Sequence, residues 1–195
     1  MSVNGTKVIT GVVRASFVHV FKPYAVKADQ EAKYSIMALI DKNDKATIKD
    51  IRAGIKAAID QGTSTLWGGK EPKKLHIPLR DGDDEKDTEE HPEYEGMMFF
   101  NASSKRAPGL IDRHKQELFD EEELKSGDYV KLSINFYPYS VSGSNGIAVG
   151  LNNVMKWKDG EALGGGRVAA STDFDGEFDD EFDDGDDEED MDDIL

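Results

Sequence analysis

Cysteine is absent from the 195 residues, and only four histidines occur. Without cysteine, disulfide bonds and thiolate metal sites are excluded. The histidines are scattered, without the spacing of a metal site such as a helical His-Glu-x-x-His, at His19, His76, His91 and His114. We therefore expect no bound metal ion and no cofactor.

Long apolar runs are missing as well. No stretch approaches the roughly 20 apolar residues that a membrane helix needs. The first residues do not combine a charged start with the apolar segment of a signal peptide. These absences predict a cytoplasmic protein that makes no membrane contact.

Positive charge is outnumbered, with 24 Lys and Arg against 40 Asp and Glu and a net charge of −16. Fifteen of the acids lie between Ser171 and Leu195, where there is no Lys or Arg, so this tail accounts for −15 and the body for −1. Asp81–Glu95 holds nine further acids and one lysine, a net of −8. The rest of the body is therefore basic, at +7, and the low overall pI does not describe its surface.

The acidic stretch 81–95 invites comparison with a metal site. Alternate carboxylates with the spacing of a calcium loop are Asp81, Asp83, Glu85 and Asp87. However, Lys86 stands where such a loop needs glycine, and Pro92 stands where it needs its last carboxylate. We favour a solvated, mobile loop. A metal-dependent nuclease that uses Asp81, Asp83 and Asp87 is a weaker alternative, because metal ligands for catalysis belong on rigid elements.

The apolar pattern predicts mostly strands and one helix. Lys45–Gly62 places Ile48, Ile51, Ile55 and Ile59 on one face, with Asn43 or Asp44 as its cap and Gly62 as its end. Leu75–Leu79 is a possible short strand, and residues 104–116 form a basic connector. The five main strand segments are Thr6–Phe21, Ala32–Ile40, Gly96–Ser103, Asp128–Ser140 and Gly146–Trp157.

These elements favour a mainly β fold, an OB-fold-like five-stranded barrel with one capping helix, long loops and a disordered acidic C-terminal tail. A β-sandwich is the competitor, although it usually has more strands at shorter spacing. We expect residues 1–163 to form one domain and 164–195 to form a Gly-rich linker and the tail. Phe17 and Phe136 are expected in the core, together with only one of Phe99 and Phe100.

Basic residues alternate with aromatic residues along the body, as single-stranded nucleic acid requires. Cations neutralise phosphates, and exposed rings stack on unpaired bases. The rings expected to stack on bases are Tyr24, Trp67, Tyr137, Tyr139 and Trp157. The cations expected to hold phosphates are Lys70, Lys105, Arg106, Arg113, Lys131 and Lys156.

The tail ends in "DMDDIL", in which an apolar pair follows a run of carboxylates. A tail that served only solubility would need charge but no apolar tip. We expect a partner protein to bind Asp192, Asp193, Ile194 and Leu195, and the tail to compete with nucleic acid for the basic body.

This layout resembles bacterial and phage single-stranded DNA-binding proteins. Four segments, "PKKLHIPLRDGD", "GMMFFNASSKRAPGLID", "SGDYVKLSINFYPY" and "GIAVGLNNVMKWKDGEALGG", resemble in order and spacing a phage family of such proteins, formerly known as a domain of unknown function. The match extends from Thr6 to Gly166. It implies an OB fold, sequence-independent binding of single-stranded DNA, no catalysis and a tail that serves partners. Leu195 departs from the broader class, in which many tails end in Phe.

We therefore predict a non-enzymatic protein that binds and protects single-stranded DNA during phage replication, recombination or repair in the host cytoplasm. Its tail would recruit replication or recombination proteins, and a homo-oligomer is possible. The alternative is an acidic-tailed protein-binding or chaperone-like module without specificity for nucleic acid. That alternative predicts no preference for single strands over duplex DNA.

Overall fold

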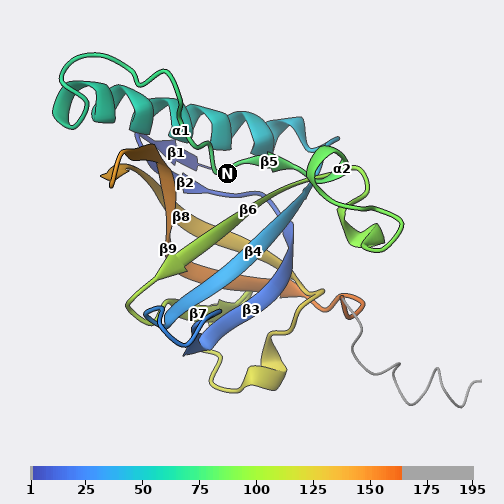
Figure 1. Ribbon diagram of the computed structural model, residues 1–195. Coiled ribbons are helices and arrows are strands. Elements are labelled where there is room, and N and C mark those ends of the chain that lie inside the picture. The colour runs from blue at the N-terminus through green and yellow to red at the C-terminus, as the bar shows by residue number, and fades with distance from the viewer. Residues whose placement is uncertain (1, 164–195) are drawn as a thin grey trace, which may run out of the picture. The chain divides into compact units, whose positions relative to one another are not determined.

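Five strands close into a ring, as the computed structural model of residues 2–163 shows (Figure 1). Around the ring the order is β3 (Val13–Tyr24), β4 (Lys33–Asp41), β6 (Met97–Ser104), β9 (Ser144–Lys158) and β8 (Tyr129–Val141), and β8 returns to β3. All of these pairings are antiparallel except β6 with β9, which meet in parallel at Ser103 and Gly150. The closed ring confirms the five-stranded barrel and argues against the sandwich, whose sheets stay open.

Shorter strands extend the barrel. The N-terminal β1 (Ser2–Asn4) and β2 (Lys7–Ile9) form a hairpin that pairs with β8. The two-residue β5 (Arg80–Asp81) pairs with β6, and β7 (Gly109–Asp112) lies parallel to β9. The predicted basic connector 104–116 thus contains a strand. Leu75–Leu79 forms no strand, although His76 makes an isolated bridge to Gly146.

The helix α1 (Lys45–Thr65) covers one end of the barrel (Figure 1). Asp44 caps it by accepting a hydrogen bond from the Thr47 amide at 3.0 Å, as predicted. Gly62 does not end the helix, which continues to Thr65. Glycine is required at this position for space, because a Cβ atom there would lie 2.7 Å from both Pro138 and the Trp67 ring.

The predicted strand Thr6–Phe21 is broken into β2 and β3. Between them, Thr10 is fully buried and exchanges hydrogen bonds with Leu132, and the Gly11 amide donates to the Thr47 hydroxyl. Within β3, a bulge lies between Ser16 and His19. Phe17 sits in this bulge with a φ of 46° and is 58% exposed, so its predicted place in the core is wrong.

Residues 80–95, predicted as a loop, contain short elements and fold against the outer face of β4 and β6. They include β5, the single turn α2 (Gly82–Glu85) and the 3-10 turn η1 (Pro92–Tyr94). Tyr94 is buried against Phe99, with their ring centroids 5.2 Å apart. Because this segment covers the outer face, Phe99 and Phe100 are both buried, on opposite sides of β6, and the expectation of only one buried ring is wrong.

The predicted alternation of the strand Asp128–Ser140 is confirmed in β8. Its inward side chains are fully buried at Val130, Leu132, Ile134 and Phe136. Before β8, a second 3-10 turn, η2 (Glu121–Glu123), is held by a capping box between Asp120 and Glu123. The outward side chains of β8 are therefore presented on a rigid strand of the ring.

Candidate nucleic-acid interface

A row of paired residues, three of them small, crosses four strands on the outer surface of the barrel. Gly150 of β9 pairs with Ser103 of β6, Ser103 with Ser35 of β4, and Ser35 with His19 of β3. We call these four residues the cross-strand row. Because Gly150, Ser103 and Ser35 are small, a chain-like ligand can lie close to the backbone over this part of the row.

Aromatic rings stand at both ends of this row. At one end, the Tyr137 ring lies beside Gly150, since a Cβ atom on Gly150 would be 3.6 Å from Tyr137 Cε1. At the other end, the rings of His19 and Tyr24 stack with their centroids 4.3 Å apart. Tyr137 is 45% exposed and Tyr24 is 52% exposed, so each ring has a free surface for a base.

A cavity of about 420 Å³ lies over the Tyr24 end of the row. Tyr24, Lys33, Ser35 and Ser103 are among the residues that line it. Lys105 and Arg106 follow directly after β6 and are exposed. Lys105 forms an ion pair with Glu31 at 2.8 Å, and both of these side chains are largely solvated, so a phosphate could replace the carboxylate at little cost.

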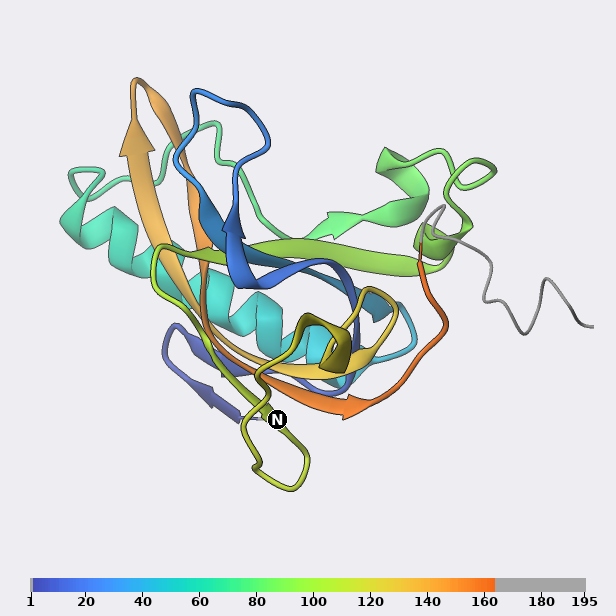
Figure 2. The same cartoon turned by 90° about the horizontal axis from the view of Figure 1, so that it is seen from below.

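The loop between β3 and β4 and the β8–β9 hairpin rise on the same side of the barrel as the acidic segment 80–95 (Figure 2). Between them run β4 and β6. The acidic segment covers the part of this face that holds Met37, Leu39 and Phe99. The cross-strand row lies outside that covered part and is open to a ligand.

A second group of cations and rings lies where β8 begins and β9 ends. Lys131 Nζ lies 4.4 Å from the centroid of the Trp157 ring, and Lys158 Nζ lies 4.6 Å from that of Tyr129. Lys131 and Tyr137 occupy the same face of β8, six residues apart, which corresponds to about 20 Å along a strand. A single strand of nucleic acid that follows β8 could contact both.

Arg113 and Lys156 lie next to Trp157, around a cavity of about 270 Å³. Lys156 Nζ contacts Asp128 at 3.2 Å and Asp159 at 2.6 Å, and it donates to the Glu123 carbonyl. Burial opposes the charged form of Lys156, but its hydrogen bonds to Asp159 and Asp128 outweigh this effect and raise its pKa. Its charge is thus matched by two carboxylates, the buried one of Asp128 and the exposed one of Asp159.

The same carboxylate of Asp128 fixes the last described residues. It accepts a hydrogen bond from the Gly160 amide at 3.0 Å, and Arg14 donates to the Glu161 carbonyl at 2.8 Å. We call Arg14, Asp128, Lys156, Gly160 and Glu161 the terminal clasp. Lys156 is therefore a structural cation in addition to a candidate phosphate contact.

Three other predicted site residues lie apart from the row. Trp67 follows α1 and packs against the core beside Gly62, with its indole N–H buried and bonded to no described group. Lys70 is exposed in the turn after Trp67. Tyr139 is half-buried, with its hydroxyl beside Gly146. The tail residues Asp192, Asp193, Ile194 and Leu195 lie outside the described residues.

Asp81 and Asp83, considered above as metal ligands, both contact the Lys42 ammonium group, at 2.5 and 2.6 Å. Hydrogen bonds from Lys42 are the main cause of the lowered pKa of each carboxyl. Within residues 2–163, no three His, Asp or Glu side chains are grouped to hold a metal ion. No helix in this part of the chain is long and apolar enough to cross a membrane.

The sequence suggested Tyr24 and Tyr137 as stacking rings but did not indicate the cross-strand row that lies between them. His19, Ser35, Ser103 and Gly150 have no common motif, and only strand pairing brings them together. A weak signal was available in the small and polar residues that interrupt apolar strands, at Ser35 and Gly150. Without the pairing, however, the sequence could not place them side by side.

Comparison with known proteins places the chain among phage proteins. A family model described as "Enterobacter phage Enc34, ssDNA-binding protein" matches residues 6–191. A curated relative, putative protein p50 of Acyrthosiphon pisum secondary endosymbiont phage 1, is 34% identical over 173 residues, covering 84% of this chain and 89% of its own.

Solved structures give the same picture. The single-stranded DNA-binding protein from bacteriophage Enc34 in complex with ssDNA is similar with a TM-score of 0.70 and 27% identity, covering 82% of this chain and 90% of that chain. The single-stranded DNA-binding protein gp2.5 of bacteriophage T7 has a TM-score of 0.57 at 14% identity, covering 84% and 98%, and supports the fold alone.

Proposed function

The chain belongs to the family of the Enterobacter phage Enc34 ssDNA-binding protein, a family without enzymatic activity, and from this membership we propose that it binds single-stranded DNA without sequence preference. The observation that carries the proposal is the cross-strand row with aromatic rings at both ends. Stacking on Tyr137 and Tyr24 tolerates any base, since every base has a π-face.

Phosphates would lie along the cations that flank this path. Lys105 and Arg106 adjoin the Tyr24 end, and Lys131 lies farther along β8. Trp157 offers a further ring beside Lys131 and Arg113. We assign Trp67, Lys70, Tyr139 and Lys156 a secondary role. Trp67 and Tyr139 are partly buried, Lys70 lies in the turn after Trp67, and Lys156 is already paired with two carboxylates.

Duplex DNA suits this surface poorly. The exposed rings at the two ends of the row can stack on unpaired bases. The bases of a duplex already stack on each other and are not available to these rings. Binding should therefore favour single strands, and each stacked base contributes about 1–3 kcal/mol. The protein would coat and protect strands exposed during phage replication, recombination or repair in the host cytoplasm.

The acidic tail would act on this binding in two ways. Its 15 carboxylates resemble a short polyanion and would compete with DNA for the basic body. Its last residues, Asp192, Asp193, Ile194 and Leu195, would be bound by replication or recombination proteins through an apolar pocket edged with cations. Both roles are supported by the sequence pattern.

Fluorescence anisotropy with labelled single-stranded and duplex DNA over a range of salt concentrations tests the proposal. The complete chain should bind single strands more tightly than duplex, and affinity should fall with salt as counterions are released. A variant ending at Ala170 should bind more tightly, most clearly at low salt. Equal affinity for single strands and duplex would support the protein-binding module, and no binding by either chain would refute DNA binding.

Partner recruitment needs a separate measurement. Replacement of Ile194 and Leu195 by serine keeps the charge of the tail and removes its apolar end. The change should leave the affinity for DNA unaltered and abolish co-purification with replication proteins of an infected host. Unchanged co-purification would show that the charge alone attracts partners or that they bind elsewhere.

A further inference from the structure

We propose that Phe17 is a base-stacking residue, held out of the barrel by the bulge in β3 so that its ring meets a nucleobase at the His19 end of the cross-strand row. The inference rests on the proposed binding of single-stranded DNA. It assigns a contact to a residue whose aromatic side chain would otherwise be expected in the core.

The backbone of Phe17 is the first observation. Its φ of 46° lies in the left-handed region, which glycine and asparagine adopt readily and bulky side chains rarely do. Strain of this kind is retained where the surrounding structure imposes it, and it collects at functional sites. A glycine would satisfy the bulge without strain, so the presence of phenylalanine needs another reason.

The bulge explains how the ring reaches the surface. Before it, the inward residues of β3 are Val13 and Ala15, which are 2% and 0% exposed. After it, Val20 points inward and is 1% exposed. The extra residue between Ser16 and His19 changes which positions face the core, and Phe17 belongs to neither buried cluster. Regular alternation would have turned its ring inward.

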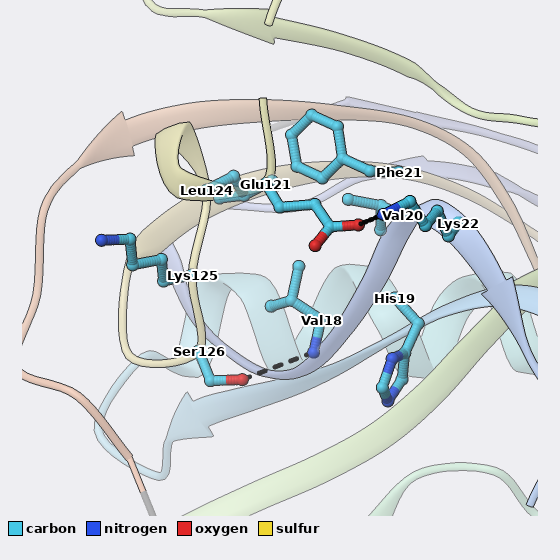
Figure 3. A pocket seen from close by; sticks show the side chains of 9 residues that line it. All are labelled: Val18, His19, Val20, Phe21, Lys22, Glu121, Leu124, Lys125 and Ser126. Carbon is cyan, nitrogen blue, oxygen red and sulfur yellow. Dashed lines mark hydrogen bonds and ion pairs between the residues drawn. The ribbon is translucent and has the colours of Figure 1, made fainter. Parts of the chain in front are cut away.

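A cavity beside the bulge is not filled by the Phe17 ring. Residues of β3 and of the segment around η2 enclose this cavity of about 240 Å³ (Figure 3). Val18, Val20, Phe21 and Leu124 are among the lining residues, while Phe17 is not. The Val18 amide donates to the Ser126 hydroxyl at 3.4 Å, and Lys22 forms an ion pair with Glu121 at 2.9 Å (Figure 3). These contacts tie the strand after the bulge to the segment before β8.

The position of Phe17 fits a ligand on the row. Phe17 precedes His19 by two residues in β3, within the bulge, and the His19 ring already stacks on Tyr24. His19 in turn pairs with Ser35 on the row. A strand of DNA that leaves the row over His19 would therefore meet the exposed Phe17 ring next, and its base could stack there.

The test compares Phe17→Ala with Phe17→Trp and with Phe119→Ala in the complete chain, using a single-stranded oligodeoxythymidine of about 20 nucleotides. Phe119 is the matched control, because it is 80% exposed and lies before η2, outside the row. Phe17→Ala should weaken binding about 5- to 150-fold, the range of one lost stacking contact. Phe17→Trp should retain full affinity, and Phe119→Ala should behave as the unchanged chain.

Phe17→Gly separates stacking from a structural role. Glycine accepts the backbone conformation of the bulge, so the variant should unfold at a temperature no lower than the parent while losing affinity as Phe17→Ala does. A lower unfolding temperature with unchanged affinity would identify a structural residue and overturn the proposal.

A measurement on the unchanged chain avoids dependence on variants. Irradiation of the complex with an oligonucleotide containing 5-iodouracil should cross-link a base to Phe17, and peptide mass spectrometry would locate the bond. Cross-links at Tyr24 or Tyr137 without one at Phe17, with Phe17→Ala binding normally, would remove Phe17 from the interface and leave the proposed function intact. If the unchanged chain had no affinity for single strands, the proposed function itself would fail.

Discussion

Lys131 is the predicted phosphate contact whose ammonium group lies against an aromatic ring, that of Trp157. Replacing Lys131 therefore measures how much one phosphate contact contributes to the electrostatic part of DNA binding. Lys131→Gln removes one counterion-releasing contact, so affinity at physiological salt should fall several-fold. The slope of log affinity against log salt should decrease in magnitude by about 0.7, the value for one phosphate of a single strand.

Lys49→Gln is the matched control for Lys131→Gln, since Lys49 is exposed on α1 and far from the row in the fold. Filter binding or anisotropy over a range of salt concentrations measures both variants. Equal changes in slope for the two would mean that the protein senses only its total charge.

Gly62 is the residue at which the helix depends on close packing. Alanine is intrinsically about 1 kcal/mol better than glycine inside a helix. Nevertheless, Gly62→Ala should destabilise the fold by about 1–3 kcal/mol, because its methyl group would lie 2.7 Å from Trp67 and Pro138. Gln61→Ala, at the exposed neighbouring position, should be neutral or slightly stabilising. Urea unfolding measures the stability of both variants. A Gly62→Ala variant as stable as the parent would show that Pro138 and Trp67 can move to make room for the added methyl group.

Among the elements, the acidic segment 80–95 depends on pH through Lys42. Both Asp81 and Asp83 have a pKa below the ordinary value of 3.8, chiefly because Lys42 donates to them. The unfolded chain takes up these protons first, so the stabilising contribution is present above about pH 4 and is lost as pH falls below it. Acid should therefore weaken the attachment of the segment.

Lys42→Gln tests this origin of the acid sensitivity. The variant should show a smaller fall in unfolding temperature than the parent between about pH 5 and about pH 3. Lys56→Gln is a suitable control, because the ion pair of Lys56 with Asp60 is exposed on α1. An unaltered pH profile in Lys42→Gln would place the sensitivity in other carboxylates.

The sequence predicted the elements that follow a regular apolar periodicity. It did not predict the bulge in β3 or the burial of side chains under the acidic segment 80–95. Each of the five main strand segments overlaps one strand of the ring, and the isoleucine stripe located α1. The bulge at Phe17 was not predictable, since phenylalanine is not a residue that signals positive φ. Phe99 is buried because Tyr94 of the acidic segment packs on it, and the charge of that segment had led to its prediction as a mobile loop.

For the candidate site, the sequence indicated which rings are exposed but not which cations are already paired within the fold. Exposed rings at Tyr24 and Tyr137 follow from their parity or loop position, and the proposal for them remains to be tested. Lys156 was expected only as a phosphate contact, because its partner Asp128 is 28 residues away in the sequence and comes close only through β8 and β9 pairing.

At the scale of the whole molecule, the terminal clasp holds the last residues that the structure describes to the barrel. A variant ending at Gly164 keeps the clasp and the packing of Leu163, and it should unfold at the same temperature as the complete chain. A variant ending at Lys158 loses the bonds of Gly160 and Glu161, and it should unfold several degrees lower. Calorimetry distinguishes them, and equal unfolding temperatures would mean that the clasp is not stabilising.

The ring is joined between β6 and β9 by one described pair, Ser103 with Gly150, and this pair forms the Tyr137 end of the cross-strand row. The thinnest seam of the barrel therefore lies beneath the path of the ligand. A bound DNA strand would contact both β6 and β9, so the free energy of binding would also stabilise the closed form of the barrel. Amide exchange along this seam should slow on binding, and opening of the seam would be a route by which a tightly held strand is released.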